Sequence, residues 1–122
     1  MGESEIANVL RKCSLTGAWY GSDLKTIFDA NFMGDSPLHT VCSWGELDAV
    51  KLLVQAGADI NAVGDLGATP LFNAVIGGNI DVVAFLVSRG ANMNIIDDTG
   101  NSAFSFAKKN NMAAEMLRLL KS

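Results

Sequence analysis

Apolar residues between positions 38 and 87 follow the spacing of short amphipathic helices. At 100° per residue they form two stripes, and the same two stripes recur further along the chain. The first two consist of Leu38, Val41, Cys42 and Gly45, and of Leu47, Val50, Leu53 and Val54. The second two consist of Leu71, Ala74, Val75 and Gly78, and of Ile80, Val83, Leu86 and Val87. The pattern therefore predicts two helix pairs, each buried along one face.

Residues that start and stop helices stand at the ends of these stripes. A hydroxyl residue can cap the first turn of a helix, and a proline that follows it loses no hydrogen bond there. Glycine at a helix end adopts the left-handed conformation easily. These signals are Ser36, Pro37, Gly45 and Gly57 in the first pair, and Thr69, Pro70, Gly78 and Gly90 in the second. The segments that follow, "ADINAVGDLG" and "ANMNIIDDTG", are typical of turns.

The two helix pairs are related by an offset of 33 residues, at which eleven positions are identical. These positions are Gly34, Pro37, Leu38, Gly45, Asp48, Val50, Leu53, Val54, Gly57, Ala58 and Asn61, matched by Gly67, Pro70, Leu71, Gly78, Asp81, Val83, Leu86, Val87, Gly90, Ala91 and Asn94. So many identities in one register indicate an internal repeat.

In period and in residues, "GDSPLH" with "GELDAVKLLVQAGADIN", and "GATPLF" with "GNIDVVAFLVSRGANMN", resemble ankyrin repeats. The resemblance is specific from Gly34 to Ile96 and weaker toward both ends. It implies an all-α solenoid of about four helix pairs with short β-hairpin tips and degenerate capping repeats at both ends. The chain is then one domain, 1–122, made of a degenerate N-terminal repeat (1–33), two repeats (34–66 and 67–99) and a C-terminal cap (100–122).

The two ends of the chain are expected to close the stack. Leu52 and Phe85 lie nearly opposite the core stripe, which requires a neighbouring repeat, but the next counterpart is the charged Arg118. In the final stretch we expect burial of Phe104, Ala107, Met116, Leu119 and Leu120. At the front, "SEIANVLRK" and "GSDLKTIFDANF" predict a degenerate helix pair. Between them, Trp19 and Tyr20 either cover the open end of the core or belong to a binding site.

Acidic residues are concentrated in the centre of the chain. Residues 29–98 hold nine acids and two bases, a net charge of −7, whereas the two ends together carry +3. An acidic centre disfavours direct binding of nucleic acid and attracts a basic protein surface. The alternative is that these acids only keep an apolar domain soluble.

Residues for catalysis or for metal binding are sparse. His39 is the only histidine, and in the ankyrin pattern it forms hydrogen bonds within the turn. Cys13 and Cys42 lack zinc spacing and are expected to be buried, reduced thiols. Asp97 and Asp98 lack the alternating ligands of a calcium loop. We therefore expect no enzyme activity, cofactor or metal. No membrane span is expected either, since no apolar run approaches the roughly 20 residues of a membrane helix.

Binding of a partner protein remains as the function to expect. Trp44 and Ile76 lie off the core stripe, and the resemblance implies that these helix positions and the tips form a concave face that holds partners. The candidate partner-binding residues are Phe32, Met33, Ser43, Trp44, Val63, Asp65, Leu66, Ile76, Gly77, Ile96, Asp98, Thr99, Lys109 and Asn110. Exposed apolar residues usually mark interfaces, and Trp is favoured at their energetic centres. The alternative for Trp44 is packing against a neighbouring hairpin. Gly77 is expected to leave room for an inserted side chain or for the indole of Trp44.

The sequence thus predicts a non-catalytic protein-binding module that is cytoplasmic and monomeric when unbound, with a basic partner. Its most specific interpretation is an immunity or antitoxin-like protein that neutralises a toxin by occlusion. That interpretation depends on the small acidic array and on analogy with its family. One alternative is an intracellular inhibitor or adaptor of a signalling enzyme, similar to the small ankyrin inhibitors of cyclin-dependent kinases. Another is a structural subunit of a larger assembly.

Overall fold

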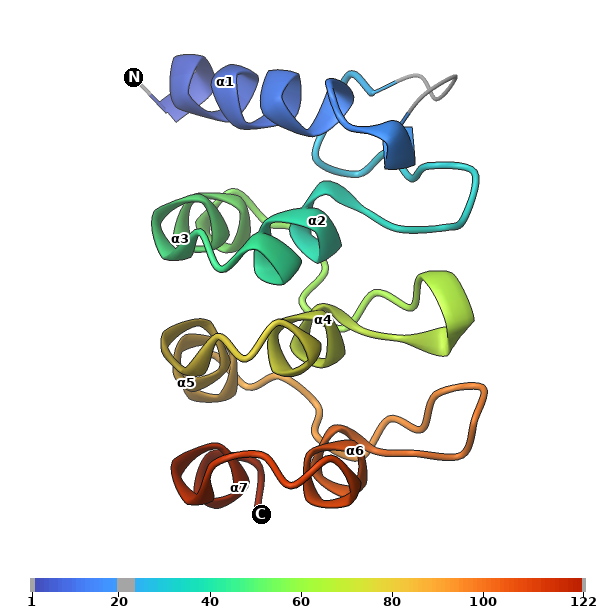
Figure 1. Ribbon diagram of the computed structural model, residues 1–122. Helices are drawn as coiled ribbons and strands as arrows, with labels where there is room; N and C mark the ends of the chain where they lie inside the picture. The colour runs from blue at the N-terminus through green and yellow to red at the C-terminus, as the bar shows by residue number, and fades with distance from the viewer. Residues whose placement is uncertain (1, 20–23, 122) are drawn as a thin grey trace.

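The chain folds into a stack of helix pairs with a single helix lying across one end (Figure 1). The structure, a computed structural model, describes residues 2–19 and 24–121. The pairs are α2 (Pro37–Trp44) with α3 (Leu47–Gln55), α4 (Pro70–Ile76) with α5 (Ile80–Ser88), and α6 (Ala103–Lys109) with α7 (Ala114–Leu120). The single helix is α1 (Gly2–Ser14), and the 3-10 turns are η1 (Gly17–Trp19) and η2 (Asp65–Gly67). The predicted all-α repeat solenoid is confirmed.

The helices form two parallel rows. α2, α4 and α6 contact one another in sequence, and α3, α5 and α7 form the second row (Figure 1). Three loops extend from the first row, on the side away from the second row (Figure 1). We call these loops the first tip (residues 31–35), the second tip (64–68) and the third tip (97–101).

The predicted helix ends are formed as expected. The Ser36 and Thr69 hydroxyls accept the backbone N–H groups of His39 and Phe72, so each caps the first turn of its helix. At the other end of α2, Gly45 takes the left-handed conformation at φ 76°. The two caps and the Gly45 turn set the length of the first-row helices and direct the chain into the second row.

The core lies between the two rows and along the stack. Its largest fully buried members include Trp19, Leu38, Leu53, Leu71, Phe72, Leu86, Met116 and Leu120. The outer residues of the second-row stripes, such as Leu47 and Val87, are half-buried and pack against this core. Each pair therefore buries its apolar stripes against its neighbours, as a repeat array requires.

The tips are turns, and the structure does not show the predicted β-hairpins: within residues 2–19 and 24–121 no strand is formed. A strand pair needs a ladder of backbone hydrogen bonds. In each tip a backbone bond joins the first residue to the last, from Asn31 to Asp35, from Gly64 to Ala68 and from Asp97 to Asn101, at 2.8–2.9 Å between N and O. The other backbone bonds of the tips are turn bonds, apart from one between tips, from Asp98 to Leu66, and they form no ladder. Side-chain acceptors bind further loop N–H groups, those of Met33 and Asp35 in the first tip and of Thr99 and Asn101 in the third.

The N-terminal segment differs from the predicted helix pair. α1 is a helix, but the described part of "GSDLKTIFDANF", residues 24–32, contains no helix. The Asp29 carboxylate instead accepts the backbone N–H groups of Lys25 and Thr26 at 2.8 and 2.7 Å, and these bonds lower the pKa of Asp29. Such side-chain bonds hold the chain in a turn and compete with helix formation. The prediction of a second helix in this pair is therefore wrong for residues 24–32.

Trp19 covers the end of the core, as one of the two interpretations expected. Its side chain is only 1 % exposed, and its indole N–H donates to the Thr40 hydroxyl at 3.1 Å. A buried Trp whose N–H has a partner is a structural residue. Tyr20 lies outside the described residues.

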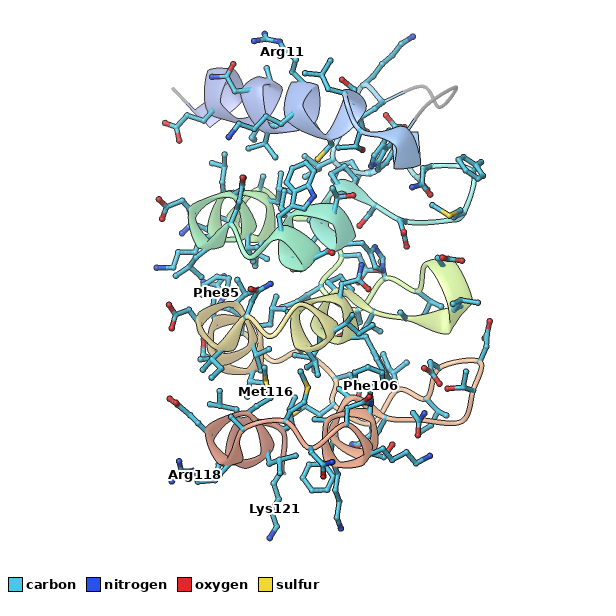
Figure 2. All side chains as sticks on the ribbon, in the orientation of Figure 1. Arg11, Phe85, Phe106, Met116, Arg118 and Lys121 are labelled. Atoms are coloured by element: carbon cyan, nitrogen blue, oxygen red, sulfur yellow. The ribbon has the colours of Figure 1, made fainter. Side chains whose placement is uncertain are left out.

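At the C-terminal end, α6 and α7 form the last pair. Ala107, Met116 and Leu120 are buried, whereas Phe104 and Leu119 are only half-buried. Cationic side chains point away from both ends of the stack: Arg11 from α1, and Arg118 and Lys121 from the region of α7 (Figure 2). In the described part of the chain, no helix is long and apolar enough to cross a membrane.

Candidate partner-binding face

The residues predicted to bind a partner lie almost entirely at the surface. Met33 and Asp65 are half-buried, and the others are exposed: Phe32, Ser43, Trp44, Val63, Leu66, Ile76, Gly77, Ile96, Asp98, Thr99, Lys109 and Asn110. They come from the tips and their flanks and from the C-terminal ends of α2, α4 and α6. We call this set the tip face.

Large exposed apolar side chains concentrate on the tip face. Across the described residues, the exposed large apolar side chains on this face are Phe32 (75 %), Trp44 (40 %), Val63 (59 %), Leu66 (66 %), Ile76 (57 %) and Ile96 (55 %). Two others, Leu15 and Phe28, lie in the N-terminal segment. Water-exposed apolar side chains gathered on one side of a domain are typical of an interface.

Trp44 ends α2 and stands outside the core. Its 40 % exposure leaves part of the indole available to a partner, although more than half of its surface is covered by the protein. The next residue, Gly45, turns the chain immediately toward α3. The indole is therefore held at a helix end rather than on a flexible loop, which suits a binding anchor.

Gly77 does not leave an open space, contrary to the expectation from the sequence. A Cβ at this position would lie 2.8 Å from the Ser43 carbonyl oxygen and 2.6 Å from the Asn79 amide nitrogen. That amide donates to the carbonyls of Cys42 and Ser43 at 3.0 and 3.3 Å. Gly77 therefore permits a close contact between the ends of α2 and α4, and the Asn79 side chain occupies the room beside it.

His39 is a structural residue, as expected. It is 0 % exposed, and its Nδ1 accepts the Ser36 N–H at 3.0 Å while Nε2 lies 3.0 Å from the Ala68 carbonyl oxygen. The neutral imidazole has one acceptor and one donor, so these partners define it as the Nε2–H form. Burial lowers the pKa of His39, although the Ala68 carbonyl and the Asp35 charge oppose that shift. The imidazole thus joins α2 to the second tip and is inaccessible to a substrate.

The second tip carries the most unusual backbone of the face. Leu66 has φ 57° and ψ 23°, a left-handed conformation that leucine rarely adopts, and its side chain is 66 % exposed. Nothing in the core requires this side chain. The sequence indicated Leu66 as a face residue but gave no sign of its conformation.

Charge is distributed unevenly around the stack. Lys51 and Arg89, the two bases of residues 29–98, both lie over the Phe85 ring, at 5.9 and 5.8 Å from its centre. Phe85 belongs to α5 in the second row, between α3 and α5 (Figure 2). The central cations therefore lie with the second row, whereas the tips carry acids such as Asp35, Asp65 and Asp97.

The described residues contain no group of three or more His, Cys, Asp or Glu side chains that could hold a metal ion. Cys13 and Cys42 are free and buried, and burial raises the pKa of both thiols, that of Cys13 to about 11. Protonated, enclosed thiols are poor nucleophiles and poor metal ligands. Their environment is that of packed core residues.

Some surface features were not predicted from the sequence. Leu15 and Phe28 are 81 and 72 % exposed, but they lie where the 33-residue register fails. Asp35 and Phe106 join the tip face in a shared hollow, described below, although neither was a candidate. The available signal for Asp35 was its position in the first tip, one residue before the Ser36 cap.

These features define a helical repeat array with an exposed, partly apolar face. A family model described as ankyrin repeats (3 copies) matches residues 2–97, so the chain belongs to the ankyrin repeat family. The match includes α1 and the irregular segment after it, where the resemblance in sequence is weakest. No curated protein matches the chain. Ankyrin repeats form a class of protein–protein interaction module that is generally non-catalytic, and this chain is a protein–protein interaction module of that class.

Proposed function

We propose that the tip face binds a partner protein with a basic surface and blocks that surface by occlusion. The observation that carries the proposal is the concentration of exposed apolar side chains on this face. Side chains such as Phe32, Leu66 and Ile76 gain free energy when a partner removes them from water. Trp44 is the expected anchor because large aromatic residues supply most of the binding energy in many interfaces.

The charge distribution supports a basic partner. Carboxylates stand on all three tips, while Lys51 and Arg89 are held on Phe85 in the second row. An acidic face speeds the encounter with a basic surface and disfavours other partners. We further propose that the protein is monomeric when unbound, cytoplasmic and non-enzymatic, a setting that suits its two free thiols.

The most specific form of the proposal is an immunity or antitoxin-like role. Enzymes that attack nucleic acid carry basic surfaces, and an acidic face with apolar anchors can cover such a surface. Co-expression tests this role directly: the protein should restore growth of cells that express the partner, beginning with the product of the adjacent gene. A partner that is harmless when expressed alone would contradict the immunity role and leave the binding role intact.

Substitution of Trp44 tests the binding role. Trp44→Ala should weaken the partner complex by at least about 2 kcal/mol, the loss typical of a hot spot, and should change the free energy of unfolding by no more than about 1 kcal/mol. Calorimetric titration and urea denaturation measure the two quantities. Leu15→Ala is the matched control, since Leu15 is 81 % exposed but lies outside the tip face. Equal weakening by both variants, or full affinity of the Trp44 variant, would contradict the proposal.

A further inference from the structure

A hollow of about 510 Å³ opens on the tip face between the second and third tips. α4 and α6 pack together at its base, and its walls combine carboxylates with apolar side chains. The lining residues that matter here are Asp35, Asp65, Asp97, Leu66, Ile76 and Phe106. They come from all three tips and from both helices, so the hollow exists only in the assembled stack.

The fold holds two of the three carboxylates in place. Asp35 Oδ1 accepts the Asp65 backbone N–H at 2.9 Å. Asp97 Oδ1 accepts the backbone N–H groups of Thr99 and Asn101 at 2.9 Å and the Thr99 hydroxyl at 2.7 Å. Partial burial raises the pKa of Asp97, but these bonds outweigh it and lower the pKa overall. Both carboxylates are therefore acceptors that the fold holds in fixed positions.

The third carboxylate is available to a ligand. In the described part of the chain, no hydrogen bond or ion pair involves the Asp65 carboxylate, although its backbone is fixed by Asp35. Gly64 makes this arrangement possible, because a Cβ there would collide with the Asp35 carboxylate and the His39 ring. The fold thus brings two acids from neighbouring tips together without a cation between them.

The apolar part of the hollow has a stable floor. Phe106 projects from α6 toward α4 (Figure 2) and meets the buried Phe72 edge to face, with 6.2 Å between ring centres. Ile76 and Leu66 are 57 and 66 % exposed and stand beside it. A ligand that enters must therefore present a long apolar stem as well as a positive charge.

We propose that this hollow receives an arginine side chain of the partner protein. This inference rests on the proposed function and names the chemistry that the tip face recognises. The apolar stem of arginine would pack on Ile76 and Leu66, and its guanidinium group would reach the carboxylates. The guanidinium has five donors in a planar fork, so it serves several acceptors at once and stacks on aromatic rings, which lysine does less well.

The cations of the protein itself do not fill the hollow. Lys109 is the basic residue of the tip face, and its Nζ donates to Asn101 Oδ1 at 2.8 Å, at the edge of the third tip. Lys51 and Arg89 remain on Phe85. No lysine or arginine of the described residues therefore lines the hollow beside these carboxylates.

Short peptides test the inference without the natural partner. The probe is acetyl-Gly-Arg-Gly-amide, compared with the same peptide carrying lysine or citrulline, the neutral isostere of arginine. Two-dimensional NMR at low salt follows the backbone amides of the full chain. The arginine peptide should give saturable shifts confined to the three tips (residues 31–35, 64–68 and 97–101) and to the amides around Ile76 and Phe106, with weaker shifts for lysine and none for citrulline.

Two variants with the same net charge provide the control. Asp65→Asn should weaken binding of the arginine peptide about tenfold, since it removes a charged acceptor that the fold does not use. Asp81→Asn, on the exposed first turn of α5, should change it by less than roughly twofold, as expected for a distant surface charge. Equal effects of the two variants, equal binding of citrulline, or tighter binding of lysine would overturn the proposal.

The result separates this inference from the proposed function. If the peptide does not bind but Trp44→Ala still weakens the partner complex, the arginine site is wrong and the tip face remains the interface. If the peptide binds the hollow while Trp44→Ala leaves the partner complex intact, the site stands and the occlusion proposal falls.

Discussion

Residues 34–66 and 67–99 fold alike but present different surfaces. Both segments cap their first helix with a hydroxyl, and both bury the same stripe positions, such as Leu53 and its counterpart Leu86. At the exposed end of the first helix, however, Trp44 corresponds to Gly77. Positions that build the stack are thus repeated, whereas positions that face outward are free to differ, and these define what the array can bind.

Inward-facing positions also differ between the two segments, and their contact partners differ with them. Position 39 is histidine and binds the Ala68 carbonyl of the next tip, whereas its counterpart, Phe72, is apolar and packs edge to face on Phe106. Asp97 fixes its own tip through its side chain, but its counterpart is Gly64, and there the Asp35 carboxylate of the preceding tip binds the loop instead. Adjacent repeats are therefore coupled by polar contacts as well as by the apolar core.

The largest loss of stability is expected from substitutions of buried residues that are identical in the two segments. Leu53→Ala and Leu86→Ala should each reduce the free energy of unfolding by about 2–5 kcal/mol, since both side chains are 0 % exposed and their loss leaves a cavity. Urea denaturation followed by circular dichroism measures both. Leu66→Ala, on an exposed leucine, should show no comparable loss. If one buried leucine were tolerated and its counterpart were not, the two segments would not be equivalent in their packing.

A smaller loss of stability is expected from substitution of Gly77, where the two segments differ at a close contact. Gly77→Ala should reduce the free energy of unfolding by about 1–3 kcal/mol, because the new methyl group overlaps the Ser43 carbonyl, which is backbone and cannot turn away. Thermal unfolding measures the change. Gly17→Ala is the control, since among residues 2–19 and 24–121 no atom beyond its two chain neighbours lies within 4 Å of its added methyl group. A neutral Gly77 variant would show that the ends of α2 and α4 separate easily.

Much of this architecture could be predicted from the sequence because it depends on local, repeated signals. The caps at Ser36 and Thr69 and the core stripes all repeat at one offset, so each segment supports the interpretation of the other. The N-terminal segment has no repeat partner, and the Asp29 bonds that replace its second helix depend on a single side chain. Helix periodicity alone could not reveal that competition.

The candidate site was predictable in its outline and not in its details. Exposure of Trp44 and Ile76 follows from their angle to the core stripe. The packing of Asn79 against Gly77 and the hollow that includes Asp35 depend on contacts between segments about 30 to 37 residues apart. Such contacts follow from the stacking distance of neighbouring repeats, which the sequence of one repeat does not specify.

The contrast between His39 and Phe72 predicts a pH dependence of stability. The pKa of His39 is lowered by burial in the folded state, so the unfolded chain binds more protons as pH falls below about 6.5, and the fold loses stability there. The loss should reach up to about 2 kcal/mol at pH 5. Asp35 and Asp59 favour the charged imidazole and reduce this loss. Urea denaturation between pH 8 and 5 measures it.

The matched variant is His39→Phe, which places the residue of position 72 at position 39. This variant should be less stable at pH 8, because the Ser36 N–H loses its acceptor and the Ala68 carbonyl loses one of its two donors and keeps only the Gly64 N–H. Its free energy of unfolding should change little between pH 7 and pH 5. A variant that kept the slope of the natural protein would assign the pH dependence to groups other than His39.

The smallest effect concerns Leu66, which differs from the matching residues of the other tips, Met33 and Thr99, in its left-handed backbone. Leu66→Asn should raise the free energy of unfolding by about 1 kcal/mol relative to Leu66→Ala, because asparagine tolerates this conformation and alanine does not. Both variants lose the exposed apolar side chain, so both should weaken binding of the partner. The strained conformation would then be retained because it presents a leucine to the partner at the wall of the hollow. A gain in stability for Leu66→Asn without any loss of binding would show that the conformation serves neither the fold nor the interface.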